Sequence, residues 1–278
     1  MPIRKVFEIR DSKPTTEGAG VRLRRAFSHD DANLDPFLLF DDFHSDNPED
    51  YMAGFPWHPH RGIETVTYVI SGSVEHQDSL GNKGIIKSGD VQWMTAGSGI
   101  IHHEMPQKSE MMQGFQLWIN LPAKKKMTDP KYRDIKSKEI PEVKINKGVT
   151  AKIIAGKIGK TEGPVKDLTV DVEYFYITMK PNSELVLKTK NGYSTFAYLI
   201  EGKLMSGKKE INERQLAIFL NGDSVSVKTK DKSARFIFAS GKPLKEPVAW
   251  YGPIVMNTQE QLKQAFRELE TNTFIKKK

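Results

Sequence analysis

The sequence predicts an all-β protein built from two β-barrels or sandwiches, with a short helix near its C-terminal end. Three observations lead to this prediction. Short segments rich in β-branched and aromatic residues alternate with glycine-containing turns along most of the chain, which is the pattern of barrels and sandwiches. The second half repeats parts of the first half. A charged stretch over residues 122–141 lies between the two.

The strands of the first half are expected to follow one another closely. Residues 21–27 alternate in character from one position to the next, the period of a strand with one buried face. Turns that contain Gly72, Gly81 or Gly89 separate the later segments. The expected strands cover residues 3–9, 21–27, 35–43, 65–70, 74–77, 85–86, 91–94 and 115–121.

The strand pattern resumes after the charged stretch. The segments are again short, apolar and bounded by turns, so each half is long enough to form a barrel of its own. The expected strands of the second half cover residues 149–154, 170–179, 185–187, 195–200, 215–220, 225–227 and 234–239.

The end of the chain has a different period. Its apolar residues recur with the spacing of one helical face at Leu262, Ala265, Phe266 and Leu269. Asn257, with Glu260 three positions later, resembles a capping box. We therefore expect a helix over about residues 258–270, packed on a barrel.

The two halves resemble copies of one unit. Residues 58–72 align with residues 188–202, and the Gly89-Asp90 turn recurs as Gly222-Asp223. The matching pairs are Gly62 and Gly192, Thr65 and Thr195, Tyr68 and Tyr198, Ile70 and Ile200, and Gly72 and Gly202. This repeated order favours internal duplication. We expect an N-terminal domain over residues 1–133, a linker over 134–145, and a C-terminal domain over 146–278 that carries the helix.

Composition excludes several classes of function. The 278 residues include no cysteine, which excludes disulfides, thiolate metal sites and cysteine nucleophiles. No apolar run has the length of a signal peptide or of a membrane span. The net charge of +7 comes from scattered lysine and arginine residues, so a solvated basic surface is favoured over a nucleic-acid site. We expect a monomeric intracellular protein, cytoplasmic and, in a eukaryote, nuclear as well.

Two pairs of potential metal ligands stand out. His58 and His60 precede the strand over residues 65–70, and His102 and Glu104 lie in the later run GIIHHEMP. Residues two apart on a strand point to the same face, so each pair offers two ligands from one wall. Three imidazoles and one carboxylate suit iron, copper, nickel or zinc, and Fe(II) in particular where positions stay open for oxygen chemistry.

The other histidines are weaker candidates. His103 points to the face opposite its two neighbours, and we do not expect it to be a ligand. We expect His29, His44 and His76 to be structural or exposed. In the second half, His58 and His60 align with Lys188 and Lys190, and an ammonium group has no lone pair for a metal. We therefore predict a metal in the first barrel and none in the second.

The motifs that carry these ligands resemble the pirin family, within the cupin superfamily. The resemblance rests on HPHRGIETVTY at residues 58–68, GDVQWMTAGSGIIHHEMP at 89–106 and QLWINL at 116–121, with further matches at 35–43, 139–141 and 253–258. It covers nearly the whole chain and is more specific in the first half. It implies a bicupin of two β-barrels with iron in the N-terminal one, held by His58, His60, His102 and Glu104.

The carboxylate ligand has one alternative. Many cupins take it from the first motif, which here is Glu64, and a continuous strand would keep Glu64 on the ligand face. Because Gly62 is able to break that alternation, we prefer Glu104 as the ligand. Glu64 is expected to hold the second nitrogen of a histidine ligand.

The resemblance also implies an activity, the O₂-dependent ring opening of a flavonol of the quercetin 2,3-dioxygenase type. Glu104 would be both ligand and general base for the 3-hydroxyl proton, and the ring would open with loss of carbon monoxide. Apolar residues near the ligands, Phe43, Phe55, Trp57, Met94 and Phe115, are candidates for the pocket wall, although a place in the barrel core is favoured for most of them.

Two other functions are consistent with the sequence. Some pirins are transcription cofactors, so an iron-dependent regulatory protein with a protein partner is the main alternative. Its expected surface is a basic one around Arg22, Arg24, Arg25 and the lysine runs at residues 124–126 and 276–278. Direct sequence-specific binding of nucleic acid is not expected, because no helix-turn-helix or zinc finger is present. A zinc- or nickel-dependent isomerase or hydrolase is the third candidate.

Overall fold

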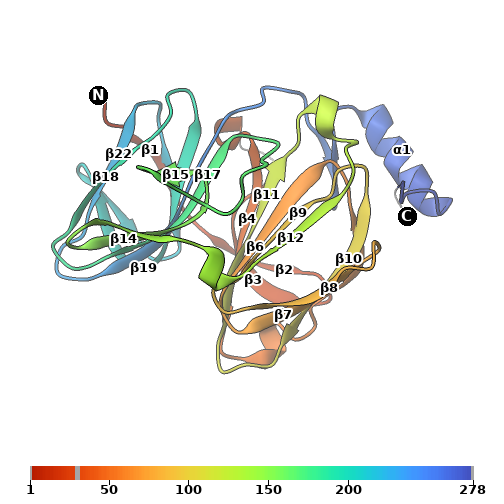
Figure 1. Ribbon diagram of the computed structural model, residues 1–278, viewed down its shortest axis with the longest axis horizontal. Helices are drawn as coiled ribbons and strands as arrows, with labels where there is room; N and C mark the ends of the chain where they lie inside the picture. The colour runs from red at the N-terminus through yellow and green to blue at the C-terminus, as the bar shows by residue number, and fades with distance from the viewer. Residues whose placement is uncertain (1, 29–31, 277–278) are drawn as a thin grey trace. The chain divides into compact units, whose positions relative to one another are not determined.

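The computed structural model describes residues 2–28 and 32–276 (Figure 1). The described chain is mostly β-strand and forms two compact units. The first unit comprises Pro14–Asp30, Phe37–Ser137 and Leu244–Lys278, and the second comprises Met1–Lys13, Asp31–Pro36 and Lys138–Pro243. The expected all-β fold with a C-terminal helix is confirmed. Among the described helices, none combines the length and apolar character that crossing a bilayer requires.

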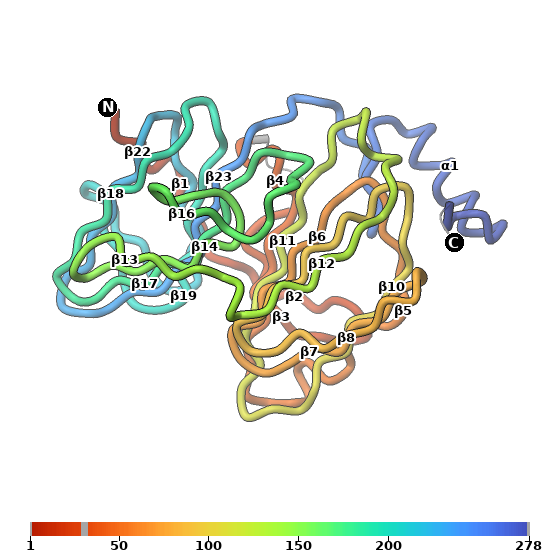
Figure 2. The backbone as a smooth tube through the Cα atoms, viewed as in Figure 1, coloured from red at the N-terminus to blue at the C-terminus, as the bar shows by residue number. Residues whose placement is uncertain are grey.

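Two antiparallel sheets form the barrel of the first unit (Figure 2). One has the order β12-β9-β6-β11-β4-β3-β2, and the other has the order β5-β10-β7-β8. The bounds in the larger sheet are β2 (Lys13–Glu17), β3 (Val21–Phe27), β4 (Phe37–Ser45), β6 (Ile63–Ser71), β9 (Val91–Thr95), β11 (Met112–Asn120) and β12 (Lys131–Ile135). Those in the smaller sheet are β5 (Phe55–His60), β7 (Ser73–Asp78), β8 (Lys83–Lys87) and β10 (Ile100–Gln107). Short 3₁₀ turns occupy η2 (Pro48–Asp50) and η3 (Ala123–Lys125).

The C-terminal segment completes the first unit. It contains the hairpin β24 (Ala249–Tyr251) and β25 (Ile254–Met256), followed by helix α1 (Gln259–Glu270). The helix starts one residue later than predicted, and its capping box is a different pair. Thr258 Oγ1 accepts a hydrogen bond from the backbone N–H of Gln261 at 3.2 Å. Gln261 Oε1 accepts one from the backbone N–H of Thr258 at 3.2 Å. Leu262 and Ala265 of the predicted apolar face are buried with the residues of the hairpin.

The second unit is a barrel of the same kind. Its main sheet has the order β1-β21-β19-β23-β17-β14-β13, and β18, β20 and β22 pair off this path. Its strands are β1 (Val6–Asp11), β13 (Glu142–Asn146), β14 (Val149–Ala155), β15 (Lys157–Ile158), β16 (Thr161–Glu162), β17 (Val172–Met179), β18 (Glu184–Lys188), β19 (Ser194–Ser206), β20 (Lys209–Asn212), β21 (Gln215–Phe219), β22 (Ser224–Lys228) and β23 (Ala234–Gly241). The 3₁₀ turns are η1 (Ala32–Leu34) and η4 (Ser137–Glu139).

The division of the chain differs from the expected one at both ends and in the middle. The expected boundary between the first domain and the linker falls after residue 133. In the structure, residues 131–135 form one strand, β12, which pairs with β9. Residues 142–146, expected as linker, form β13 and pair with β14. The C-terminal segment with its helix belongs to the first unit, and residues 1–13 belong to the second. Backbone hydrogen bonds between distant segments decide these memberships, and sequence order does not reveal them.

Backbone conformation agrees with internal duplication at the turns. Gly62 and Gly192 have φ of 79° and 80°, and Gly72 and Gly202 have φ of 86° and 87°. These left-handed conformations favour glycine at both members of each pair. The interior of the second barrel is apolar, with buried residues such as Leu187, Val225 and Phe236 in one cluster. Lys188, the counterpart of His58, is exposed.

Glu173 in β17 is a buried acid that should make the fold sensitive to pH. Glu173 is only 6% exposed, and its Oε2 atom has no hydrogen-bond partner among the described residues. Burial raises the pKa of Glu173 to about 7. Between pH 4.5 and 7 the folded protein therefore binds this proton more tightly than the unfolded chain, and the free energy of unfolding falls as pH rises.

We expect Glu173→Gln to increase the free energy of unfolding at pH 8 by roughly 1–3 kcal/mol and to have little effect at pH 4.5. Urea unfolding at the two pH values measures this difference. Glu162→Gln, at an exposed site in the same unit, is the control. Equal pH slopes in the wild type and Glu173→Gln would contradict the assignment.

Candidate metal centre

The first predicted ligand pair lies on an edge strand. β5 is at the edge of the sheet β5-β10-β7-β8, where Pro56 and Pro59 are tolerated because the unpaired side needs no N–H donors. In the register with β10, His58 lies opposite His102 and His60 lies opposite Ile100. The alternation of β5 therefore turns His58 and His60 to one face, and direct cross-strand pairing brings His102 to them.

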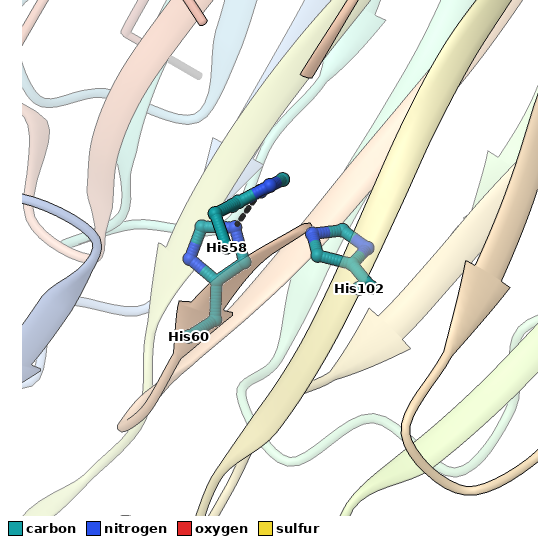
Figure 3. Close-up of side chains that lie close together, drawn as sticks. All are labelled: His58, His60 and His102. Atoms are coloured by element: carbon teal, nitrogen blue, oxygen red, sulfur yellow. Dashed lines mark hydrogen bonds between the residues drawn. The ribbon is translucent and has the colours of Figure 1, made fainter. Parts of the chain in front are cut away.

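The three imidazoles converge on one point (Figure 3). Ring nitrogens of His58, His60 and His102 all lie within 4.8 Å of one another. The His58 and His60 Nε2 atoms are 3.1 Å apart, and the ring centroids of His58 and His102 are 4.3 Å apart. His60 and His102 are buried, and His58 is partly exposed at the mouth.

The remaining nitrogens fix the tautomers of His58 and His60. His58 Nδ1 is 2.9 Å from the Pro56 carbonyl oxygen, and His60 Nδ1 is 3.1 Å from the Pro253 carbonyl oxygen. Carbonyl oxygens only accept, so in each neutral ring Nδ1 carries the proton and Nε2 carries a lone pair. With both rings neutral, two lone pairs would face each other across 3.1 Å. A cation between them and His102 removes this repulsion.

His102 provides an independent test of whether the residues fit a metal ion. Both of its ring nitrogens are buried, and neither has a hydrogen-bond partner among the described residues. Buried polar atoms are nearly always satisfied in native proteins. Burial, with the neighbouring His58, lowers the pKa of both His60 and His102 well below its usual value, so both rings are neutral at pH 7 and able to act as ligands. The residues present fit a metal ion.

Glu104 is near the cluster but its carboxylate is held elsewhere in this structure. Oε1 accepts from Thr67 Oγ1 at 3.1 Å, and Oε2 accepts from Gln116 Nε2 at 3.1 Å. Glu104 follows a register irregularity between β10 and β5, and its residue is 4% exposed. The three-histidine group does not include it. The role of Glu104 as fourth ligand stays a prediction.

The expectation for Glu64 is wrong. Its carboxylate accepts from Trp93 Nε1 at 3.0 Å and from Thr95 Oγ1 at 2.7 Å. The second nitrogens of His58 and His60 instead contact backbone carbonyls. Glu64 therefore links β6 to the neighbouring strand β9.

A cavity of about 560 Å³ opens beside the histidines. Phe55, Trp57, Trp118 and Trp250 line it together with His58 and His60. Of the five expected wall residues, Phe55 and Trp57 are confirmed, and Phe43 lines a smaller adjoining cavity that also contains Glu104. Met94 and Phe115 are fully buried in the core and line neither cavity. Pattern alone does not separate core from wall on an apolar strand.

The C-terminal segment supplies part of the centre, which sequence reasoning missed. The Pro253 carbonyl that holds His60 comes from the β24–β25 turn. A Cβ at Gly62 would lie 1.9 Å from the Val255 carbonyl oxygen, so this close approach requires glycine. Lys126 Nζ joins the two strands by donating to the Gly62 carbonyl at 2.9 Å and the Val255 carbonyl at 3.0 Å.

The other histidines are only partly as expected. His103 stacks on Trp57 with centroids 4.7 Å apart, away from the cluster. His76 is fully buried, 5.4 Å from the His102 ring and stacked on Tyr132 at 4.6 Å. It is thus part of the surroundings of the centre, which its position in the sequence did not reveal. His29 lies outside the described residues.

Comparison with known proteins finds relatives that match nearly the whole chain. The family model "Pirin" matches residues 20–119, and "Pirin C-terminal cupin domain" matches residues 174–275. The chain is 41% identical to "Putative quercetin 2,3-dioxygenase" of Pseudomonas aeruginosa, over 95% of this chain and 96% of that protein. It is 41% identical to pirin of Homo sapiens, over 91% of this chain and 88% of that protein.

A solved structure extends the likeness to three dimensions. The crystal structure of quercetin 2,3-dioxygenase from Acinetobacter baumannii superposes with a TM-score of 0.91 at 31% identity, covering 98% of this chain and 99% of that one. The matched family models, the sequence relatives and the two barrels lead to the same assignment. This chain belongs to the pirin family, and its two barrels are cupin domains.

Proposed function

We propose that this protein is a metal-dependent dioxygenase that opens the central ring of a flavonol, with Fe(II) held by His58, His60, His102 and Glu104. The close approach of the His58 and His60 Nε2 atoms, 3.1 Å apart, beside the unpartnered His102 nitrogens is the observation that supports the metal. The aromatic cavity beside them supports a flat substrate. A solved structure that matches nearly the whole chain is named quercetin 2,3-dioxygenase, and this supports the reaction class.

When bound, the ion supplies Lewis acidity and open positions at which O₂ chemistry occurs. The residues of the chain do the rest. Glu104 takes the proton of the substrate 3-hydroxyl onto a carboxylate oxygen, while Thr67 and Gln116 hold that carboxylate in place. Phe55, Trp57 and Trp118 contact the rings and exclude water. The flavonol and one O₂ give a ring-opened ester and carbon monoxide, which balances all atoms.

The decisive experiment is anaerobic loading with iron, followed by quercetin and then air. We expect loss of the flavonol absorbance with matching consumption of O₂ and release of carbon monoxide. Metal analysis of protein purified without added metal separates this proposal from a zinc- or nickel-dependent isomerase or hydrolase. A protein that binds zinc alone and leaves quercetin intact would overturn it.

Replacing the base should slow the reaction without emptying the site. We expect Glu104→Gln to lower the turnover of quercetin by about 100-fold or more, since a general base contributes at least that factor. The three histidines remain and the substituted amide oxygen is still able to coordinate, so with iron in excess the metal content should fall far less than turnover. Glu75→Gln on the neighbouring strand β7 is the control, because Glu75 pairs at 3.9 Å with the exposed Lys83. Equal turnover by wild type and Glu104→Gln would remove this mechanism.

The regulatory alternative loses part of its expected surface. Arg25 lies in the cavity wall and pairs with Asp41 and Glu17. It therefore does not extend a basic surface around Arg22 and Arg24. A protein partner stays a prediction.

A further inference from the structure

The cavity beside the metal centre has a second polar group in its wall. Arg25, Asp41 and Glu17 line the 560 Å³ space together with His58 and His60. Cavities of about 300–1,000 Å³ bind one small molecule of drug size. A single ligand seated at the metal therefore has room to reach the second polar group.

This second group is an ion cluster with an excess of negative charge. Arg25 Nε and Nη2 donate to the two carboxylate oxygens of Asp41, both at 2.8 Å. Arg25 Nη1 also contacts Glu17 Oε1 at 2.8 Å. Two carboxylates face one guanidinium, so the cluster has a net charge of −1 when all three are ionised. Such a surface attracts a hydrogen-bond donor and repels a carboxylate or phosphate.

Asp41 keeps capacity for a further hydrogen bond. A carboxylate has about four acceptor sites, and Arg25 uses one on each oxygen. The Asp41 residue is only 4% exposed and it lines both the large cavity and the smaller cavity that contains Glu104. Burial raises the pKa of Asp41 to about 6, so it is still mostly ionised at pH 7.

The cluster belongs to a row of polar residues that crosses neighbouring strands of the larger sheet. Cross-strand pairing places Arg25 opposite Asp41, Asp41 opposite Gln116, and Gln116 opposite Thr67. The far end of this row holds Glu104. A buried ion pair is often no more stabilising than apolar residues of the same volume, so stability alone does not account for the cluster at this place.

We propose that Arg25 and Asp41 form a recognition subsite for a hydroxyl group on the ring of an aromatic ligand that lies farthest from the metal. The inference rests on the proposed function and adds the orientation of the substrate. The ring that carries the reacting oxygens faces the histidines and Glu104. The outer hydroxylated ring lies between Phe55, Trp57 and the ion cluster, where its hydroxyl donates to Asp41.

Two flavonols that differ only at the outer ring test the subsite. Quercetin has two hydroxyl groups on its outer phenyl ring, and galangin has none. Binding of each to the metal-loaded protein is measured without oxygen, by titration followed through quenching of tryptophan fluorescence. We expect the wild type to bind quercetin about tenfold more tightly than galangin, the effect of one hydrogen bond to a charged acceptor.

The variants remove the acceptor in two ways. Asp41→Asn should reduce the preference for quercetin to less than about twofold and leave the affinity for galangin unchanged. Because this variant leaves Arg25 without its charged partner, a double variant, Arg25→Met with Asp41→Leu, provides an apolar replacement of the pair that should fold. Melting temperatures verify folding. Asp50→Asn is the matched control, since Asp50 pairs with Arg22 at the surface of the same barrel.

The outcomes separate this inference from the proposed function. Equal affinity of the wild type for both flavonols, or a preference for quercetin that survives in both variants, would overturn the subsite. Quercetin that binds with the expected dependence on Asp41, but is not consumed in air, would overturn the reaction and leave the subsite in place. Failure of both flavonols to bind the loaded protein would overturn both.

Discussion

His102→Ala is expected to abolish stable metal binding. The substitution removes one imidazole from the group of three that lies within 4.8 Å, and of the proposed ligands it leaves only His58, His60 and Glu104. Loss of a supporting contact around a metal already costs 10–100-fold in affinity, so loss of a ligand should cost more than about 100-fold. Isothermal titration of metal-free protein with Fe(II) or Zn²⁺ measures this change.

The control for that experiment is the adjacent residue. His103 stacks on Trp57 and points away from the cluster, so His103→Ala should bind metal with an affinity close to that of the wild type. The melting temperatures of the two metal-free variants are measured first. Metal affinities are compared only if these temperatures are equal. If His102→Ala and His103→Ala bound metal equally well, the proposed centre would be wrong.

The second large effect is expected at Arg61. Its guanidinium is buried and donates to the Ser98 carbonyl at 2.7 Å and to the Phe274 carbonyl at 2.8 Å. It also pairs with Glu268 of α1 at 2.8 Å and lies 4.1 Å from the centre of the Phe274 ring. Breaking a buried pair from one side typically costs 3–5 kcal/mol. We expect Arg61→Met to lower the free energy of unfolding by about that amount.

Urea unfolding with circular dichroism measures the effect of Arg61→Met. Arg22→Met, at a mostly exposed side chain that pairs with Asp50, should stay within about 0.5 kcal/mol of the wild type. Arg61→Met should also loosen α1, which Arg61 holds through Glu268. Because His60 is the residue before Arg61, we expect the metal affinity of this variant to fall as well. A variant as stable as the wild type would show that the anchoring of α1 lies elsewhere.

Local pattern predicted the parts of this fold that depend on local physics. Alternation over residues 21–27 corresponds to β3 (Val21–Phe27), and the helical spacing of Leu262 and Ala265 corresponds to α1. The same argument found the centre, because His58 and His60 stand two apart on a strand. Geometry within one element follows directly from sequence spacing.

Features that depend on two distant segments were not predictable in the same way. The Pro253 carbonyl reaches His60 only because β24 and β25 dock on the first unit. Asp41 and Gln116 fall within the expected strands 35–43 and 115–121, but their contacts depend on cross-strand register. The partners of Glu64 also come from a neighbouring strand. A single sequence gives the face of a residue but not what lies opposite.

The docking of residues 244–278 on the first unit has a consequence for biosynthesis. The ribosome makes His58, His60 and His102 early, but it makes the carbonyl of Pro253 only after the whole second cupin. A nascent chain that has emerged as far as residue 243 still has an imidazole at His60 without its backbone acceptor. Completion of the three-histidine cluster should therefore be a late event in folding, after residues 249–256 have been synthesised.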